Sequence, residues 1–209
     1  YSFMFTQDFD DLSKAVAEKD IERITELLDG GLNVDIQPED TPVTVLILAC
    51  SYPGYEEVVS LLISREADVN FRGKEGKTPL MWAASNSYGS TKLLLENGAD
   101  VKAKADDGMT AFIQATLGVQ SKRVTTDVLD LMLEKGADIN ASTTGKNIAG
   151  WTALLFATVN GDEDLVDYLL RHGAFVNHTS DEGQSALALA RQEKYESLIQ
   201  LLKKHGALD

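Results

Sequence analysis

Hydrophobic and polar positions repeat most clearly within residues 76–100. Thr78 has a side chain that can cap a helix, and Pro79 suits a first helical position, where the missing N–H would have no partner. Small apolar residues then recur at helical spacing, a polar turn follows, and a leucine-rich run stops at Asn97 and Gly98. Glycine can adopt the left-handed conformation that ends a helix. The stretch predicts a helix, a turn, a second helix and an extended link.

The same pattern recurs along almost the whole chain. Hydroxyl residues spaced 32 to 42 residues apart match the capping position: Thr44, Thr78, Thr110, Thr152 and Ser185. Alanines after a glycine or glutamate match the closing position: Ala67, Ala99, Ala137, Ala174 and Ala207. Residues 11–33 follow the same two-helix plan without the opening Thr-Pro-Leu. A period near 33 residues indicates stacked repeats, in which each unit packs only on its neighbours.

The combination of TPLMWAA at 78–84 with GADVK at 98–102 and GADIN at 136–140 resembles ankyrin-repeat proteins. The resemblance covers roughly residues 11–208. It implies an all-α fold, an ankyrin-repeat solenoid of about six helix-turn-helix units with hairpin fingers, the outer two units acting as caps. We expect one domain over residues 1–209, with units at about 10–40, 41–73, 74–106, 107–148, 149–181 and 182–209.

The fourth unit departs most from the pattern. Its interval from Thr110 to Ala137 spans 27 residues, where the other units have 21 to 23. We expect roughly five inserted residues within 117–126, forming a longer loop at the helix-to-helix turn. This loop carries Lys122 and Arg123, a basic pair in an acidic chain, and is a secondary candidate for partner contact.

The link after the fourth unit, residues 141–150, is also lengthened and predicts a longer finger carrying Lys146 and Asn147. Loops lengthen at little thermodynamic cost, so sequence drift is one explanation. The other is function, because binding residues concentrate on loops that a rigid scaffold positions.

The resemblance further implies a concave groove, formed by the fingers and first helices, that contacts other proteins. The predicted protein-binding residues are Tyr52, Asn86, Met109, Lys146, Asn147, Trp151, Val159 and Asn160. Tyr52, Met109 and Trp151 stand out because the repeat pattern does not need them for the core, and exposed aromatic residues are frequent hot spots. Trp151 is the first candidate; the alternative is that it packs beneath the long finger.

Charge narrows the class of partner. The net charge of -14 argues against binding nucleic acid, which needs clustered lysine and arginine, and favours a protein with a basic patch. Acidic residues are densest within residues 1–40, which the cap's need for solubility also explains. The aromatic segment at 1–5, YSFMF, either packs over the first repeat or forms an arm that contacts the partner.

Catalytic and metal-binding patterns are missing from the sequence. There is no glycine-rich phosphate loop, GxSxG or HExxH, and Cys50, the one cysteine, falls on a small-residue helix face that predicts a buried structural thiol. His172 and His205 precede helix-ending glycines, where they can meet the last carbonyls. We therefore expect no enzyme activity, no catalytic residues, no metal site and no cofactor.

These observations favour a non-catalytic binding module that sequesters or inhibits one partner protein, with enzymes among the candidate partners, through the concave face and the long finger or loop. The alternative is a scaffold that joins two proteins by its two faces. We expect a monomer. No apolar run reaches membrane length, so a soluble cytoplasmic protein is the default expectation. A secreted or periplasmic location follows if a signal peptide has been removed.

Overall fold

The computed structural model describes the backbone of residues 2–38 and 40–208, and side chains from residue 7 onward. Twelve α-helices form six pairs within these residues. They are α1 (Ser2–Glu18), α2 (Ile21–Asp29), α3 (Val45–Cys50), α4 (Glu56–Ser64), α5 (Pro79–Ala84), α6 (Tyr88–Glu96), α7 (Ala111–Gln120), α8 (Asp127–Glu134), α9 (Ala153–Val159), α10 (Glu163–Arg171), α11 (Ala186–Gln192) and α12 (Glu196–Lys204). The predicted all-α solenoid of helix pairs is confirmed.

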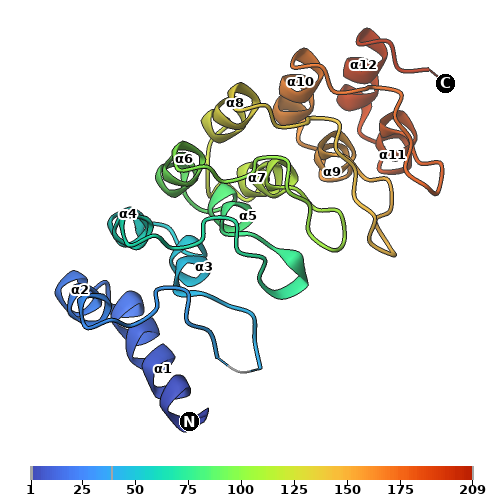
Figure 1. The fold of residues 1–209 in the computed structure, drawn as a ribbon. Coiled ribbons are helices and arrows are strands. Elements are labelled where there is room, and N and C mark those ends of the chain that lie inside the picture. The colour runs from blue at the N-terminus through green and yellow to red at the C-terminus, as the bar shows by residue number, and fades with distance from the viewer. Residues whose placement is uncertain (1, 39, 209) are drawn as a thin grey trace.

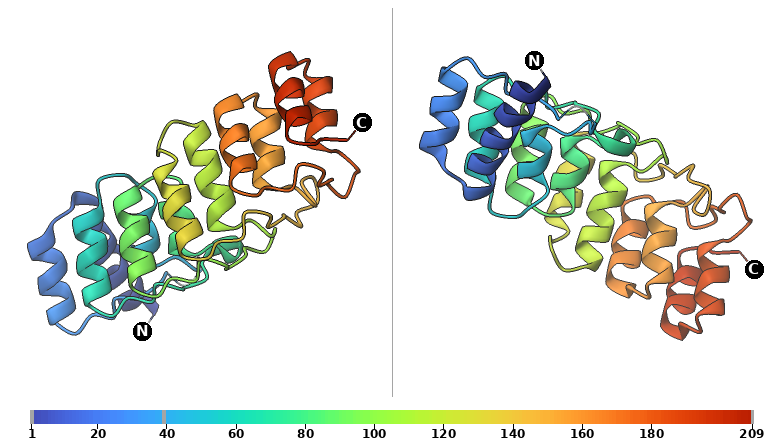
Figure 2. Two further views of the ribbon diagram at one scale, coloured as in Figure 1. Left: turned by 90° about the horizontal axis from the view of Figure 1, so that it is seen from above. Right: turned by 90° about the horizontal axis from the view of Figure 1, so that it is seen from below.

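The pairs stack side by side into two layers, with the odd-numbered helices in an inner layer and the even-numbered helices in an outer one (Figure 1). Each inner helix contacts the next inner helix along the stack. The links between pairs project away from the inner layer as a row of fingers, which Figure 2 shows along one side of the molecule. Antiparallel bridges close three fingers at Lys104 with Thr110, Ser142 with Thr152, and Thr179 with Ser185.

Small side chains explain why the inner helices approach closely. The sixth residue counted from each capping position is a fully buried alanine in every unit from the second onward: Ala49, Ala83, Ala115, Ala157 and Ala190. Three of the five hydroxyl side chains cap the helix that follows them, at Thr44, Thr110 and Ser185, whereas the predicted cap at Thr78 and the one at Thr152 make no such hydrogen bond. For example, Thr110 Oγ1 accepts a hydrogen bond from Ile113 N at 3.2 Å, and Ser185 Oγ from Ala188 N at 3.1 Å. The result is one continuous core along the stack.

A repeated asparagine links consecutive units, and we call this contact the amide clamp. In each clamp the side-chain oxygen accepts from a backbone N–H of the next unit at 2.8 Å, and the side-chain nitrogen donates to the carbonyl of the glycine that ends the next outer helix at 3.0 to 3.1 Å. The clamps are formed by Asn70, Asn140 and Asn177. In the first unit Asp35 takes this place: its carboxylate accepts a hydrogen bond from Asp68 N, but it has no side-chain nitrogen to donate the second one. Lys102 occupies the position in the third unit and cannot accept at all.

Helix α1 begins at Ser2, so residues 2–5 of the aromatic segment are helical; the side chains of this segment lie outside the described residues, and their predicted contacts stay untested. The loop expected in the fourth unit was wrong in part. The inserted residues of the fourth unit do not all enter a loop. They extend α7 to 10 residues, where α3 and α5 have 6, because residues 117–120 keep an apolar, helix-compatible pattern.

Two further expectations concern Cys50 and membrane-length helices. Cys50 is fully buried in α3, and burial raises the pKa of its thiol, as a structural cysteine requires. Among the described residues, none of the helices combines the length and the apolar character needed to cross a bilayer.

Candidate protein-binding face

The turns that follow the inner helices place Tyr52 at the centre of an exposed, hollowed surface. Tyr52 is 58% exposed, and its ring lies 5.9 Å from that of Tyr55. One hollow, of about 320 Å³, lies between this pair and α1 and is lined by Ser13, Lys14, Val16, Ala17, Leu48, Tyr52 and Tyr55. A second, of about 410 Å³, is lined by Ser51, Tyr52, Pro53, Asn86 and Arg123. Tyr52 therefore lines two neighbouring hollows, one toward α1 and one toward Arg123.

Tyr55 holds this turn against the first unit. Its hydroxyl donates to the carbonyl of Ala17 at 2.9 Å, and Lys19 Nζ lies 4.4 Å from its ring centre while donating to Gly54 O at 2.7 Å. Because Tyr55 is fixed by two contacts to the first unit, its neighbour Tyr52 is presented at low entropic cost to a partner.

The extension of α7 brings Arg123 to Asn86, although 37 residues separate them. Gly118 makes this possible: a Cβ there would lie 2.7 Å from Ser85 Cα and 2.8 Å from Ser85 O. The extra helical turn thus passes directly against the backbone after α5. Arg123 N donates back to Gly118 O at 3.0 Å, and its guanidinium lies 3.5 Å from Asn86 Oδ1. The structure thus brings Asn86, a predicted contact residue, together with the loop of Lys122 and Arg123, the predicted secondary contact.

A third, smaller hollow of about 210 Å³ continues this surface across the inner layer. Its lining residues are Ser51, Lys77, Met81, Trp82, Ser85, Asn86, Gln114 and Arg123. Lys77 Nζ lies 5.4 Å from the Trp82 ring centre and 2.9 Å from Glu75 Oε2. The hydrogen bond and charge of Lys77 lower the pKa of the Glu75 carboxyl. Trp82 and Gln114 were not among the predicted contacts, although the fifth position counted from the capping residue, where Gln114 interrupts an apolar column, was a usable signal.

Asn160 and Val159 lie at the corresponding turn of the fifth unit. Asn160 Nδ2 donates to Phe156 O at 3.1 Å and to Gln120 Oε1 at 3.2 Å. These bonds tie the end of α9 to the extended α7. Asn160 is exposed, whereas Val159 is half-buried. Both remain predicted contacts on the side of the surface away from Tyr52.

The long finger presents Lys146 and Asn147 at its exposed tip. Its base is anchored on the preceding finger, because Thr144 N and Gly145 N both donate to Asp107 O, at 2.7 and 3.0 Å. Trp151 is half-buried below, with its ring 5.1 Å from that of Phe156. The ring therefore packs against α9 and the core, and the part of Trp151 that stays exposed remains a predicted contact.

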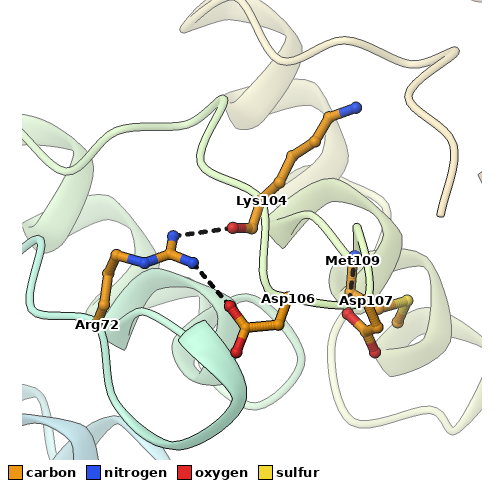
Figure 3. A network of polar contacts seen from close by, with 5 residues as sticks. All are labelled: Arg72, Lys104, Asp106, Asp107 and Met109. Carbon is orange, nitrogen blue, oxygen red and sulfur yellow. Dashed lines mark hydrogen bonds and ion pairs between the residues drawn. The ribbon is translucent and has the colours of Figure 1, made fainter. Parts of the chain in front are cut away.

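Met109 is not a groove residue, and its predicted exposure was wrong. It is only 6% exposed and belongs to the core. The finger folds back through two hydrogen bonds, from Met109 N to Asp107 Oδ1 at 3.0 Å and from Ala105 N to Met109 O at 2.9 Å. Figure 3 shows Asp107 beside Met109, and the Arg72 guanidinium reaching Asp106 Oδ1 at 3.1 Å.

Arg72 also donates to Lys104 O at 2.9 Å, so one arginine from the second link holds the third finger (Figure 3). Together with Lys77 on Glu75, these contacts partly neutralise the acidic finger tips.

Comparison with known proteins agrees with this architecture. A sequence model described as ankyrin repeats (3 copies) matches residues 12–105 and 112–208. The chain belongs to the ankyrin-repeat family. It is 52% identical over 68 residues to human ankyrin repeat and KH domain-containing protein 1, a match covering 32% of this chain and 3% of that protein. The chain spans less than half of the length of the curated relatives it matches.

Two solved ankyrin structures are similar over nearly the whole chain. An ankyrin repeat domain from Acinetobacter baumannii has a TM-score of 0.78 at 27% identity, covering 94% of this chain and 98% of that one. The ankyrin repeat domain of Bcl-3, described as a unique member of the IkappaB protein family, has a TM-score of 0.79 at 29% identity, covering 95% and 86%. Ankyrin repeats are protein–protein interaction modules, so the hollowed surface around Tyr52 is the candidate interface.

Proposed function

We propose that this ankyrin-repeat protein is a non-catalytic binding module that sequesters or inhibits one partner protein through its concave face, the extended α7 and the long finger. The observation that carries the proposal is the exposed Tyr52 between two hollows on a rigid repeat surface. An aromatic side chain beside pockets is the usual anchor of a protein interface. Enzymes with an accessible cleft are candidate partners because a cleft could receive the exposed tip of the long finger at Lys146.

The net charge of -14 favours a partner with a basic patch, reached by charge-steered association. We further propose that the free chain is a monomer. Sedimentation at low and high protein concentration tests the monomeric state. Association rates measured between about 50 and 500 mM salt test charge steering, because salt shortens the Debye length and screens the attraction.

The decisive experiment compares Tyr52→Ala with Tyr88→Ala. Tyr88 is a matched control because it is also an exposed tyrosine, at 45%, but begins the outer helix α6. We expect the partner captured by the native chain to bind Tyr52→Ala about 10 to 100-fold more weakly. Binding to Tyr88→Ala should be unchanged. Equal effects of the two substitutions would place the interface elsewhere, and a partner whose activity is unaltered at saturation would exclude inhibition.

A scaffold that joins two proteins is the second candidate, favoured by a separate pair of exposed apolar side chains. Phe175 and Leu208 are 65% and 73% exposed and occupy neighbouring units, at the position where three earlier units have aspartate. A scaffold predicts that Phe175→Asp abolishes one partner of a ternary complex while Tyr52→Ala abolishes the other. Recovery of binary complexes alone would rule this function out.

A further inference from the structure

We propose that the hollow between Tyr52 and Arg123 binds an acidic, extended peptide segment of the partner, with a carboxylate on Arg123 and an apolar neighbour against Tyr52 and Pro53. This inference rests on the proposed function and specifies the partner's chemistry at the site. It departs from the expectation drawn from net charge, which concerns long-range attraction and not the local contact.

The charges around the two hollows on the Arg123 side carry the argument. Their lining contains Lys77 and Arg123 and no carboxylate. Lys77 is already paired with Glu75 at 2.9 Å. Arg123 is exposed, and in the described part of the chain neither it nor Lys122 forms an ion pair. An acidic protein thus places an arginine without an ion-pair partner on this hollow, and a second such cation, Lys122, beside it in the sequence.

The geometry of Arg123 suits a carboxylate. Within the described residues, the guanidinium itself has one hydrogen bond, to Asn86 Oδ1 at 3.5 Å, and this long contact leaves most of its N–H donors unused. A guanidinium presents a planar fork that matches the two oxygens of a carboxylate, which lysine does not. Asn86 Nδ2 already donates to Trp82 O at 2.9 Å. The amide therefore holds its oxygen toward Arg123 and orients the fork without competing as a strong acceptor.

The neighbouring side chains specify what flanks the carboxylate. Tyr52 and Pro53 are both exposed and line the same hollow as Arg123. They offer an apolar and aromatic surface for a leucine or aromatic side chain one or two residues away in an extended segment. Lys122 lies next to Arg123 on the same loop and is exposed, so it can pair with a second acidic residue of the peptide. The pattern recognised is an acidic residue beside an apolar one, repeated over a few residues.

Nuclear magnetic resonance titration of the full chain tests the proposal with three short synthetic peptides. The first has two glutamates flanking a leucine, and the others replace the glutamates with glutamine or with lysine. We expect saturable shifts at the Asn86 side-chain amide and the Arg123 Nε–H for the glutamate peptide. Binding should weaken about tenfold for the glutamine peptide, the scale of one charged hydrogen-bonded pair, and more for the lysine peptide.

Arg123→Gln should remove most of this preference, and Arg123→Lys should restore part of it. Lys135→Gln is the matched control, because it changes the net charge equally at an exposed lysine that ends α8. Equal binding of the three peptides, or an unchanged preference in Arg123→Gln, overturns the proposal. So does a phosphoserine peptide that binds far more tightly than its glutamate counterpart, since the site would then be a phosphate site.

This test separates the inference from the function on which it rests. A captured partner that is lost with Tyr52→Ala but retained fully by Arg123→Gln would leave the binding function standing and refute the carboxylate contact. A partner retained by both variants would refute both.

Discussion

Replacing Asn140 with alanine tests whether the amide clamp stabilises the contact between the fourth and fifth units. The side chain accepts from Phe175 N at 2.8 Å and donates to Gly173 O at 3.1 Å. Two hydrogen bonds at about 0.5 to 1.5 kcal/mol each give about 1 to 3 kcal/mol. Both partner residues are exposed, so water can satisfy them in the variant. We therefore expect the free energy of unfolding to fall by about 1 to 2 kcal/mol.

Equilibrium denaturation in guanidinium chloride, followed by circular dichroism, measures this loss. Because solenoid stability is a sum over units and their interfaces, hydrogen exchange should show the loss beyond the fourth unit, with protection of the Phe175 amide reduced most. Asn140→Asp, which keeps the acceptor and removes the donor, should cost less than alanine. An unfolding free energy for Asn140→Ala equal to that of the native chain would refute the reasoning.

The reverse substitution is Lys102→Asn, which supplies the missing clamp toward the fourth unit. The backbone N–H of Asp138 and the carbonyl of Gly136 stand at the positions that the other clamps use. We expect a gain of about 1 kcal/mol. No gain would mean that the spacing of the third and fourth units differs from that of the clamped pairs.

Three more predictions concern single positions. Glu66→Gly should raise stability by about 1 kcal/mol, because Glu66 has φ +64 where other units have glycine, and a calorimetric melting temperature checks it. Gly118→Ala should destabilise by about 1 to 3 kcal/mol, because its Cβ would meet Ser85 backbone at 2.7 Å, which outweighs the gain in helix propensity; the same melting experiment measures it. The Ser87 hydroxyl lowers the pKa of the Glu56 carboxyl, so its stabilisation is present at neutral pH and is lost as pH falls below about 4.5. Ser87→Ala should flatten that pH dependence in acid titrations followed by circular dichroism.

Each of these has a control or a contrary outcome. Gly98→Ala places a side chain at φ +88 with nothing within 4 Å, so it isolates backbone strain from steric clash and should destabilise. If it does not, the left-handed argument for Glu66 fails. A stable Gly118→Ala variant would show that α7 can move away from Ser85. An unchanged acid titration of Ser87→Ala would exclude the hydroxyl as the cause.

Much of the fold was predictable because its determinants are local in sequence. The hydroxyl caps, the buried alanines such as Ala83, and the helix-ending glycines each act within one or two helical turns, and recur at one spacing. The exposed Tyr52 and the exposed finger tip at Lys146 were predictable for the same reason, since repeat position alone decides which side of a helix or finger they occupy.

The site itself depended on contacts between units. Met109 and Trp151 were singled out by the same argument as Tyr52. Met109 is covered because its finger folds back through the bond from Met109 N to Asp107 Oδ1, and Trp151 packs on Phe156 of α9. Arg123 meets Asn86 only because the inserted residues extended α7, a choice that Gly118 allows by fitting against Ser85.

The sequence by itself determined the repeat, the helix pairs and the direction in which most side chains point, because periodic capping and packing residues act over a few positions. Only the tertiary structure decided which large side chains are covered, which acids are paired, and that Arg123 lines the hollow at Tyr52. Those outcomes depend on contacts between the loops of one unit and the next. The pattern of residues within a single unit does not specify these contacts.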